Sequence, residues 1–205
     1  MLASTRRRQF ARGEVLFHEG DPADTVHFIA EGRVMARRSS PSGDSVAFRV
    51  IGPGRALGEV ALVSRDRHRS TTVIALEPTT TLSLAFADFQ RLCDEHPGIQ
   101  RQLATLLAAR VKRLSDHLVE ALFLPTDRRV LRRVVDLCDQ YDPAGSARRV
   151  SIPLSQTDIA ELAGASRPTT NRVLRRLEDE GLVQLHRGRL DVTNRPVLRA
   201  RDRAL

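Results

Sequence analysis

The hydrophobic pattern changes its period once, near Leu84, and this change constrains the fold more than any other feature. From Gly13 to Leu84 the apolar residues tend to alternate with polar ones, as they do in 26–30 and 45–50. Alternation of this kind is typical of a strand with one buried face. Glycine and proline turn signals interrupt the pattern at 19–22, 31–32, 41–44, 52–54 and 77–78. Many short strands with such punctuation predict an antiparallel sandwich or roll.

After Leu84 the spacing becomes helical. Four residues fall on one helical face and are followed by a His-Pro-Gly stop at 96–98: Phe86, Phe89, Leu92 and Cys93. A longer helix is expected up to Phe123, with apolar positions every three or four residues: Leu103, Leu107, Val111, Leu114, Leu118 and Leu122. So long a seam with charged flanks predicts a dimer helix, while packing of this helix on its own domain is the alternative.

The next boundary falls after Leu124. Pro125 disfavours continuation of the long helix, and Thr126 can cap the helix that follows. The sequence therefore predicts an α+β protein in three parts: an antiparallel β-roll sensor domain over 1–97, a dimerisation helix over 98–124, and a C-terminal domain over 125–205. Most of the net charge of +8 lies in this last, shorter part, which favours an anionic partner.

The segment 154–177 carries the strongest local signal. Ser155 can cap a helix, with Asp158 reaching back as in a capping box, and Gly164 supplies a left-handed stop. Ser166 then caps a second helix. Two short helices joined by such a turn predict a helix-turn-helix, whose second helix enters the major groove of duplex DNA.

A hairpin is expected directly after the second helix. The apolar residues of 182–185 and 189–192 flank a His-Arg-Gly turn at 186–188. This hairpin would be the wing of a winged helix-turn-helix. The alternative is an ordinary helical hairpin whose arginines are solvated, and the added wing and charge favour the winged form.

Several residues of this motif are candidates for contacts with DNA. Arg167 and Arg172 lie on the exposed face of the second helix and suit base edges. Hydroxyls and helix N-termini suit phosphate oxygens, and this group comprises Gln156, Thr157, Ser166 and Thr169. We expect Asn171 to face water rather than to read adenine.

A second informative stretch spans 58–73. Gly58 lets backbone amides approach a ligand, and Glu59 can accept a hydrogen bond from a ribose hydroxyl. The pair Arg69 and Ser70 follows ten residues later, and the set together can hold a sugar phosphate. The alternative is a β-turn with a surface salt bridge between Glu59 and an arginine.

At these two motifs the chain resembles the cyclic AMP receptor / fumarate-nitrate regulator (CRP/FNR) family of bacterial transcription regulators. Residues 58–60 with 69–70 are similar to its phosphate-binding cassette, and 166–172 to its recognition helix. The resemblance covers nearly the whole chain in the order roll, long dimer helix, winged helix. It implies a homodimer that binds a near-palindromic DNA operator, has RNA polymerase as a partner, and takes a cyclic nucleotide, foremost cyclic AMP, as its effector, with no other cofactor.

The resemblance also implies a role for each cassette residue. Arg69 would pair with the cyclic phosphate and Ser70 would donate to it, while Glu59 would accept from the ribose hydroxyl. Gly58 and Val60 would offer backbone groups.

Three positions bear on specificity in this resemblance. Ser115 falls where the family lets the partner subunit touch the base. Leu114 replaces the threonine of the cyclic AMP binders, and Pro168 replaces an acid that reads cytosine. A ligand-independent regulator of the same family, or one with another effector, is therefore the alternative.

Composition and the absence of further motifs narrow the other classes of protein that the sequence could represent. Cys93 and Cys138 are the only cysteines and lie far apart, so neither a disulfide framework nor a zinc or iron-sulfur site is indicated. No apolar run approaches the roughly 18 residues of a membrane span, and the start lacks a signal-peptide core, so a cytoplasmic protein without membrane contact is expected. The enzyme alternative is a hydrolase using Glu59 and His68, but no metal or nucleophile motif accompanies them, and we expect no enzyme.

Overall fold

The computed structural model describes residues 5–39, 45–64 and 66–204, so the turn predicted at 41–44 lies outside the described residues. The chain forms two compact units, which are described separately. The first comprises Met1–Arg38 and Val50–Val119, and the second comprises Ser39–Arg49 and Glu120–Leu205.

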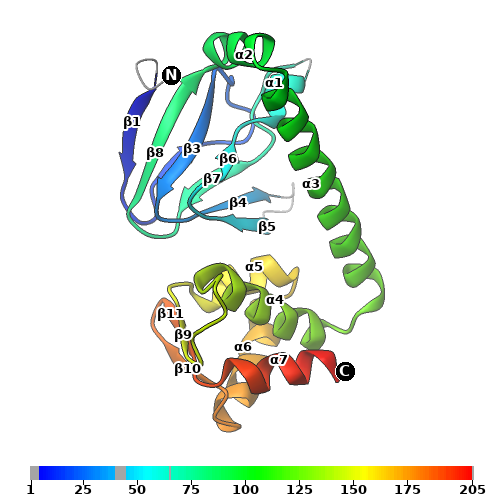
Figure 1. Cartoon of the computed structure of the whole chain (residues 1–205). Coiled ribbons are helices and arrows are strands. Elements are labelled where there is room, and N and C mark those ends of the chain that lie inside the picture. The colour runs from blue at the N-terminus through cyan, green and yellow to red at the C-terminus, as the bar shows by residue number, and fades with distance from the viewer. Residues whose placement is uncertain (1–4, 40–44, 65, 205) are drawn as a thin grey trace. The chain divides into compact units, whose positions relative to one another are not determined.

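Short antiparallel strands dominate the N-terminal part, as predicted (Figure 1). One four-stranded sheet has the order β1 (Arg6–Phe10), β8 (Thr79–Ala85), β3 (Thr25–Glu31) and β6 (Ala56–Leu57). The other has the order β2 (Val15–Phe17), β7 (Thr72–Ala75), β4 (Val34–Ser39) and β5 (Ser45–Ile51). A four-residue helix, α1 (Val60–Val63), lies in the connection between β6 and β7.

The central strand β3 shows how alternation builds this core. Its residues Val26 and Phe28 belong to the cluster around α2 (Phe86–Glu95), whereas Ile29 belongs to the cluster that contains Phe17. Both faces of β3 are therefore covered, and even the polar His27 is buried. Phe86, Phe89 and Cys93 are buried on α2, which confirms the predicted face of that helix.

The long helix α3 (Pro97–Phe123) begins at the predicted stop of α2 and contains no buried residue. Its first turns contact the roll, since Leu103 packs on the α2 cluster, so the packing alternative holds for this part. Farther along, the seam residues are exposed, among them Val111, Leu118 and Leu122. The seam thus divides into a part that packs within the chain and a part that is exposed.

From Glu120 onward, the second unit contains a three-stranded sheet and four helices that follow α3. The helices are α4 (Thr126–Tyr141), α5 (Gln156–Ala163), α6 (Arg167–Asp179) and α7 (Arg195–Arg203), and the sheet has the order β10 (Val183–His186), β11 (Arg189–Val192) and β9 (Val150–Ile152). Leu154, Ile159 and Leu174 are completely buried in its core. The winged helix-turn-helix is therefore confirmed, and β9 adds a strand to the predicted hairpin.

Local capping fixes the two helices of the motif as predicted. Ser155 and Asp158 form a full capping box, and Gly164 ends α5 with φ of 56° and ψ of 44°. Ser166 accepts a hydrogen bond from the backbone N–H of Thr169 and caps α6. Only a residue that tolerates the left-handed region ends a helix in the way Gly164 does.

The expectation that Thr126 caps α4 is wrong. Thr126 is already the first helical residue, and Pro125 is the N-cap, with no side-chain cap hydrogen bond. Instead, the Pro125 carbonyl accepts from the backbone N–H groups of Arg128 and Arg129, at 3.0 and 3.2 Å. Pro125 is extended, with ψ of 147°, so the chain turns at the proline itself.

Arg129 ties the end of α3 to the turn of the helix-turn-helix within the second unit. Its Nη1 donates to the carbonyls of Ala121 and Leu124, at 3.2 and 3.3 Å. Its Nε and Nη2 donate to the carbonyls of Ala163 and Gly164, at 3.1 and 3.0 Å. One guanidinium thus satisfies carbonyls at two helix ends, where no intrahelical donor is available.

Candidate ligand and nucleic-acid sites

Gly58 lies at the turn between β6 and α1, where the backbone must approach an arginine. Its φ is +84°, a conformation that favours glycine. A Cβ at this position would lie 2.3 Å from Nη1 of Arg69 and 3.2 Å from the carbonyl oxygen of Thr25. Glycine is therefore required both by the backbone conformation and by the space that the Arg69 guanidinium occupies.

Arg69 is held at both its backbone and its side chain. Its backbone N–H donates to the carbonyl of Asp21 and its carbonyl accepts from the N–H of Gly20, both at 2.9 Å. Nη1 donates to the carbonyl of Thr25 at 2.8 Å and Nη2 to the hydroxyl of Thr25 at 3.0 Å. The guanidinium carbon also lies 4.3 Å from the centre of the Phe17 ring, within the range of a cation–π contact.

The charge of Arg69 is buried without a close carboxylate. Its side chain is 4% exposed, and the nearest acidic oxygen, Oδ1 of the exposed Asp24, lies 4.0 Å away. Burial lowers the pKa of the Arg69 guanidinium below its usual value. Its Nε is also buried and has no hydrogen-bond partner among the described residues. A buried cation with a free donor is suited to an anionic ligand that supplies the missing charge.

Glu59 lies beside Gly58 and forms an ion pair with a residue that the sequence did not single out. It is 1% exposed, and its Oε1 accepts from Nη1 of Arg110 on α3 at 3.2 Å. The salt bridge considered for Glu59 therefore exists, although its carboxylate is buried rather than at the surface. No local pattern predicts this pair, because 51 residues separate its members.

The other predicted ligand residues are half-buried or exposed. Val60 is the half-buried first residue of α1, and Ser70 is exposed. Ser115 is exposed on α3, and its hydroxyl donates to the carbonyl of Val111 at 3.1 Å. Since five residues of a helix turn through about 140°, Ser115 and Arg110 lie on different faces of α3. Within one chain, therefore, Gly58 meets Arg69 and Glu59 meets Arg110, while Ser115 points elsewhere.

His27 is a further polar residue of this region that the sequence analysis missed. It is 2% exposed, lies 6.0 Å from Phe17 between ring centres, and contacts two hydroxyls on β3 and β8. Burial, together with the positive charge of Arg69, lowers the pKa of His27 to about 4. The ring is therefore neutral at pH 7. In the sequence His27 is one polar residue of an alternating strand, and this pattern gives no reason to select it as a site residue.

The candidate DNA interface begins at the exposed face of α6. Arg167 and Arg172 are exposed, and neither forms an ion pair or hydrogen bond in the described part of the chain. Their neighbours differ, since Arg175 pairs with Glu178 at 2.7 Å and Arg176 lies 3.5 Å from an acidic oxygen of α4. The two arginines predicted to read bases are thus the ones whose charge is not already compensated.

The predicted phosphate-binding group lies at the two helix starts. Thr157 is in the first turn of α5, and Ser166 and Thr169 are joined by a hydrogen bond of 2.9 Å between their hydroxyls. Gln156 is half-buried, and its Oε1 accepts from Nδ2 of Asn171 at 2.5 Å. The expectation that Asn171 faces water is therefore wrong, because its amide joins α6 to the start of α5.

The wing carries charge at its tip. Arg187 is exposed in the two-residue turn between β10 and β11. Asp191 on β11 lies 3.0 Å from Nε2 of His186 and 3.1 Å from Nη2 of Arg189, so these two side chains are held to the hairpin. Arg187 was not among the predicted contacts, although its place in the turn sequence identifies it as a tip residue.

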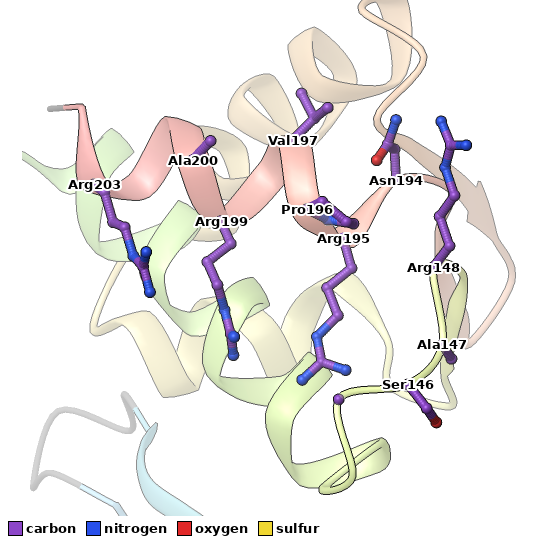
Figure 2. Close-up of a pocket in the computed structure, with 11 residues that line it drawn as sticks. Ser146, Ala147, Arg148, Asn194, Arg195, Pro196, Val197, Arg199, Ala200 and Arg203 are labelled. Carbon is purple, nitrogen blue, oxygen red and sulfur yellow. The ribbon is translucent and has the colours of Figure 1, made fainter.

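A recess of about 690 Å³ lies between α7 and the loop 145–148 (Figure 2). Figure 2 shows Arg195, Arg199 and Arg203 extending from the same side of α7. Arg195 donates to Asp142 at 2.5 Å and to Asp139 at 2.8 Å, and Arg199 also pairs with Asp139. Two of the three charges are therefore compensated, and these ion pairs fasten α7 to α4 and to the loop that follows it.

Two searches of the described residues bear on other kinds of site. Within 5–39, 45–64 and 66–204, no three His, Cys, Asp or Glu side chains are grouped so that they could hold a metal ion. None of the described helices combines the length and the hydropathy needed to cross a membrane.

Comparison with known proteins identifies two domains in the chain. Residues 7–96 match the model of the cyclic nucleotide-binding domain, and residues 128–201 match the Crp-like helix-turn-helix domain. The Cyclic AMP receptor protein of Thermus thermophilus is 30% identical over 198 residues, covering 96% of this chain and 88% of its own length. A CRP-like cAMP-activated global transcriptional regulator of Mycobacterium tuberculosis is 29% identical over 177 residues, which cover 86% of this chain and 79% of that protein.

A solved structure shares the fold. The c-di-GMP-responsive global regulator CLP of Xanthomonas campestris superposes with a TM-score of 0.80 at 22% identity, covering 93% of this chain and 95% of that one. The roll, the long helix and the winged helix-turn-helix follow one another as they do in these relatives. On this sequence similarity and on the two matched domains, the chain belongs to the CRP/FNR family of transcription regulators.

Proposed function

We propose that this regulator is a homodimer whose roll binds cyclic AMP and thereby controls the binding of the winged helix to a near-palindromic operator. The observation that carries the proposal is the buried guanidinium of Arg69, whose Nε has no partner among the described residues and whose nearest carboxylate is 4.0 Å away. A cyclic phosphate supplies one negative charge and several acceptor oxygens to such a group. RNA polymerase is the further partner that we propose for a regulator of this type.

The proposed pocket uses the predicted cassette together with Arg110. Arg69 and Ser70 take the phosphate, and the carboxylate of Glu59, oriented by Arg110, accepts from the ribose hydroxyl. Gly58 and Val60 contribute backbone groups. Ser115 contacts the base bound by the partner subunit, which is consistent with its place on a face of α3 other than that of Arg110.

The phosphate side of the proposed pocket favours any cyclic nucleotide. The base side gives only a weak preference for cyclic AMP over other cyclic nucleotides. Leu114 carries no hydroxyl, and the loss of one neutral hydrogen bond costs about 0.5 to 1.5 kcal/mol, or at most about tenfold in affinity. We therefore propose micromolar affinity for cyclic AMP with limited discrimination against cyclic GMP. Two relatives are named for cyclic AMP and one fold neighbour for c-di-GMP, so all three nucleotides belong in the test.

In the proposed DNA complex, Arg167 and Arg172 contact base edges, and a second group contacts phosphates: Gln156, Thr157, Ser166 and Thr169. The two recognition helices of a dimer would enter successive major grooves, with half-sites roughly 34 to 36 Å apart. The division into a sensor domain over 1–97, a dimerisation helix over 98–124 and a DNA-binding domain over 125–205 is part of this proposal.

Isothermal titration calorimetry tests the ligand. Cyclic AMP, cyclic GMP and c-di-GMP are titrated into the wild-type protein and into Arg69→Ala. We expect micromolar binding of cyclic AMP, a loss of more than about tenfold in Arg69→Ala, and a sharper preference for cyclic AMP in Leu114→Thr. Absence of heat with both cyclic mononucleotides, in a protein that still binds DNA, would overturn the cyclic-nucleotide proposal in favour of a ligand-independent or c-di-GMP-responsive regulator.

A further inference from the structure

The guanidinium of Arg69 is held within the roll, and one residue supplies both of its hydrogen-bond acceptors among the described residues. Nη1 and Nη2 both donate to Thr25 on β3, to its carbonyl at 2.8 Å and to its hydroxyl at 3.0 Å. We propose that Thr25, supported by His27, is a positioning residue that fixes the guanidinium of Arg69 in the orientation in which it donates to a ligand phosphate.

The hydroxyl oxygen of Thr25 shows why His27 belongs to this arrangement. This oxygen accepts from Nη2 of Arg69, and its own proton is donated to Oδ1 of Asp24 at 3.1 Å. Nε2 of His27 lies 3.4 Å from the same oxygen. His27 is 2% exposed, and its Nε2 meets one hydrogen-bonding group among the described residues, the Thr25 hydroxyl. Because the one hydroxyl proton of Thr25 is donated to Asp24, His27 pairs with Thr25 by donating from Nε2–H to the second lone pair of the hydroxyl oxygen.

This pairing implies the His27 tautomer. If Nε2 carries the proton of the neutral ring, Nδ1 accepts from the hydroxyl of the fully buried Thr81 on β8, which lies 3.2 Å away. A chain of hydrogen bonds then runs from Thr81 through His27 and Thr25 to Arg69. The lowered pKa of His27 agrees with a ring that is neutral, and so able to accept, at pH 7.

Two further contacts restrict Arg69 from other directions. Its guanidinium lies over the Phe17 ring, and Nη1 fills the space that a Cβ at Gly58 would occupy. A long arginine side chain ordinarily loses rotamer freedom when it binds a ligand, and that loss weakens binding. Because Arg69 is ordered in advance, the phosphate meets a donor that is already oriented.

Calorimetry with matched variants tests this inference, which rests on the proposed function for its ligand. Thr25→Val keeps the shape and the backbone carbonyl but removes the hydroxyl, and Thr25→Ser restores it. Thr79→Val is the control, because the hydroxyl of the buried Thr79 is also hydrogen-bonded, to the carbonyls of Arg33 and Glu77, but does not contact Arg69. We expect cyclic AMP affinity to fall about tenfold in Thr25→Val and to stay within about twofold of wild type in Thr25→Ser and Thr79→Val.

A ligand-free measurement separates this inference from the proposed function. In ¹⁵N-labelled protein, slow rotation of a held guanidinium gives resolved Nη–H signals, assigned to Arg69 by their absence in Arg69→Lys. We expect these signals in wild type and in Thr25→Ser and their loss in Thr25→Val. Unchanged signals, or wild-type cyclic AMP affinity in Thr25→Val, would overturn the positioning role. If the wild-type protein binds no cyclic nucleotide but the Arg69 signals are still lost in Thr25→Val, the positioning role would be supported. The proposed cyclic-nucleotide ligand would be overturned instead.

Discussion

At the scale of single residues, His27 links burial to the pH dependence of stability. Its pKa in the folded protein is about 4, against 6.5 for the exposed residue, so the unfolded chain binds the proton more tightly. The stabilising contribution is complete above pH 6.5 and is lost as the pH falls toward 4. Between pH 7.5 and pH 5 this loss amounts to about 2 kcal/mol.

We therefore expect the roll of the wild-type protein to lose about 2 kcal/mol more stability over this interval than the roll of His27→Gln. Native-state hydrogen exchange of the β3 and β8 amides measures the free energy of opening of the roll itself. The pKa of Asp136, which burial raises to about 6, has the opposite effect on stability, but it is common to both proteins. Equal slopes in the two proteins would show that His27 does not titrate with a lowered pKa.

Arg167 and Ser166 differ in what they contribute to DNA binding. Arg167 is exposed and uncompensated, so Arg167→Ala should cost about 1 to 3 kcal/mol on the preferred operator and relax the sequence preference. Ser166→Ala should weaken all sequences alike, through a lost phosphate contact and a lost helix cap worth about 1 kcal/mol. Fluorescence anisotropy with an operator selected from a random pool, and with random DNA, measures both. Equal losses on the two DNAs for Arg167→Ala would exclude base reading by Arg167.

At the scale of elements, the exposed part of the α3 seam predicts the dimer interface. Leu118 is 60% exposed, and Val111 and Leu122 repeat along the helix beside it. An acidic residue there would be buried without a partner in a dimer, so Leu118→Asp should give monomers. The control is Ala109→Asp, which places the same charge on an exposed position of α3 off the seam. Light scattering measures the mass, and a dimeric Leu118→Asp would place the interface elsewhere.

Elements with local signals could be predicted from the sequence, and elements that depend on distant contacts could not. The capping box of Ser155 and the left-handed Gly164 encode their helix ends within a few residues. In contrast, α7 contains only one buried apolar residue, Leu198, and is fastened by ion pairs of Arg195 with α4 and the loop after it. Its arginine-rich sequence contains too few apolar residues to form an apolar stripe, so hydrophobic periodicity did not indicate a helix at α7.

The candidate ligand site divides in the same way. Gly58, Glu59 and Arg69 belong to one short segment, and their spacing together with the family resemblance selected them. Arg110 and Thr25 lie 51 and 44 residues from the groups they hold, and only the fold brings them there. Sequence motifs and the resemblance therefore predicted the groups proposed to touch the ligand but not the groups that orient them.

At the scale of the whole molecule, ligand and DNA are expected to be coupled through α3. Arg110 on α3 holds Glu59 of the proposed pocket, and Arg129 ties the last carbonyls of the same helix to the turn between α5 and α6. A ligand that changes the position of α3 in the dimer would therefore change the presentation of the recognition helices. Such coupling is a free energy shared by two sites, so it must act equally in both directions.

We therefore expect cyclic AMP to raise the operator affinity, and the operator to raise the cyclic AMP affinity by the same factor, typically about 5- to 150-fold. Anisotropy titrations of labelled operator with and without cyclic AMP measure one direction, and calorimetry of cyclic AMP into free and operator-bound protein measures the other. Arg69→Ala should keep the ligand-free operator affinity and lose the increase, because the contacts that the substitution removes, those with Thr25, with Phe17 and with the proposed phosphate, all lie in the roll. Tight binding of cyclic AMP without any change in operator affinity would mean that the nucleotide binds both states of the dimer equally, and that it does not control this regulator.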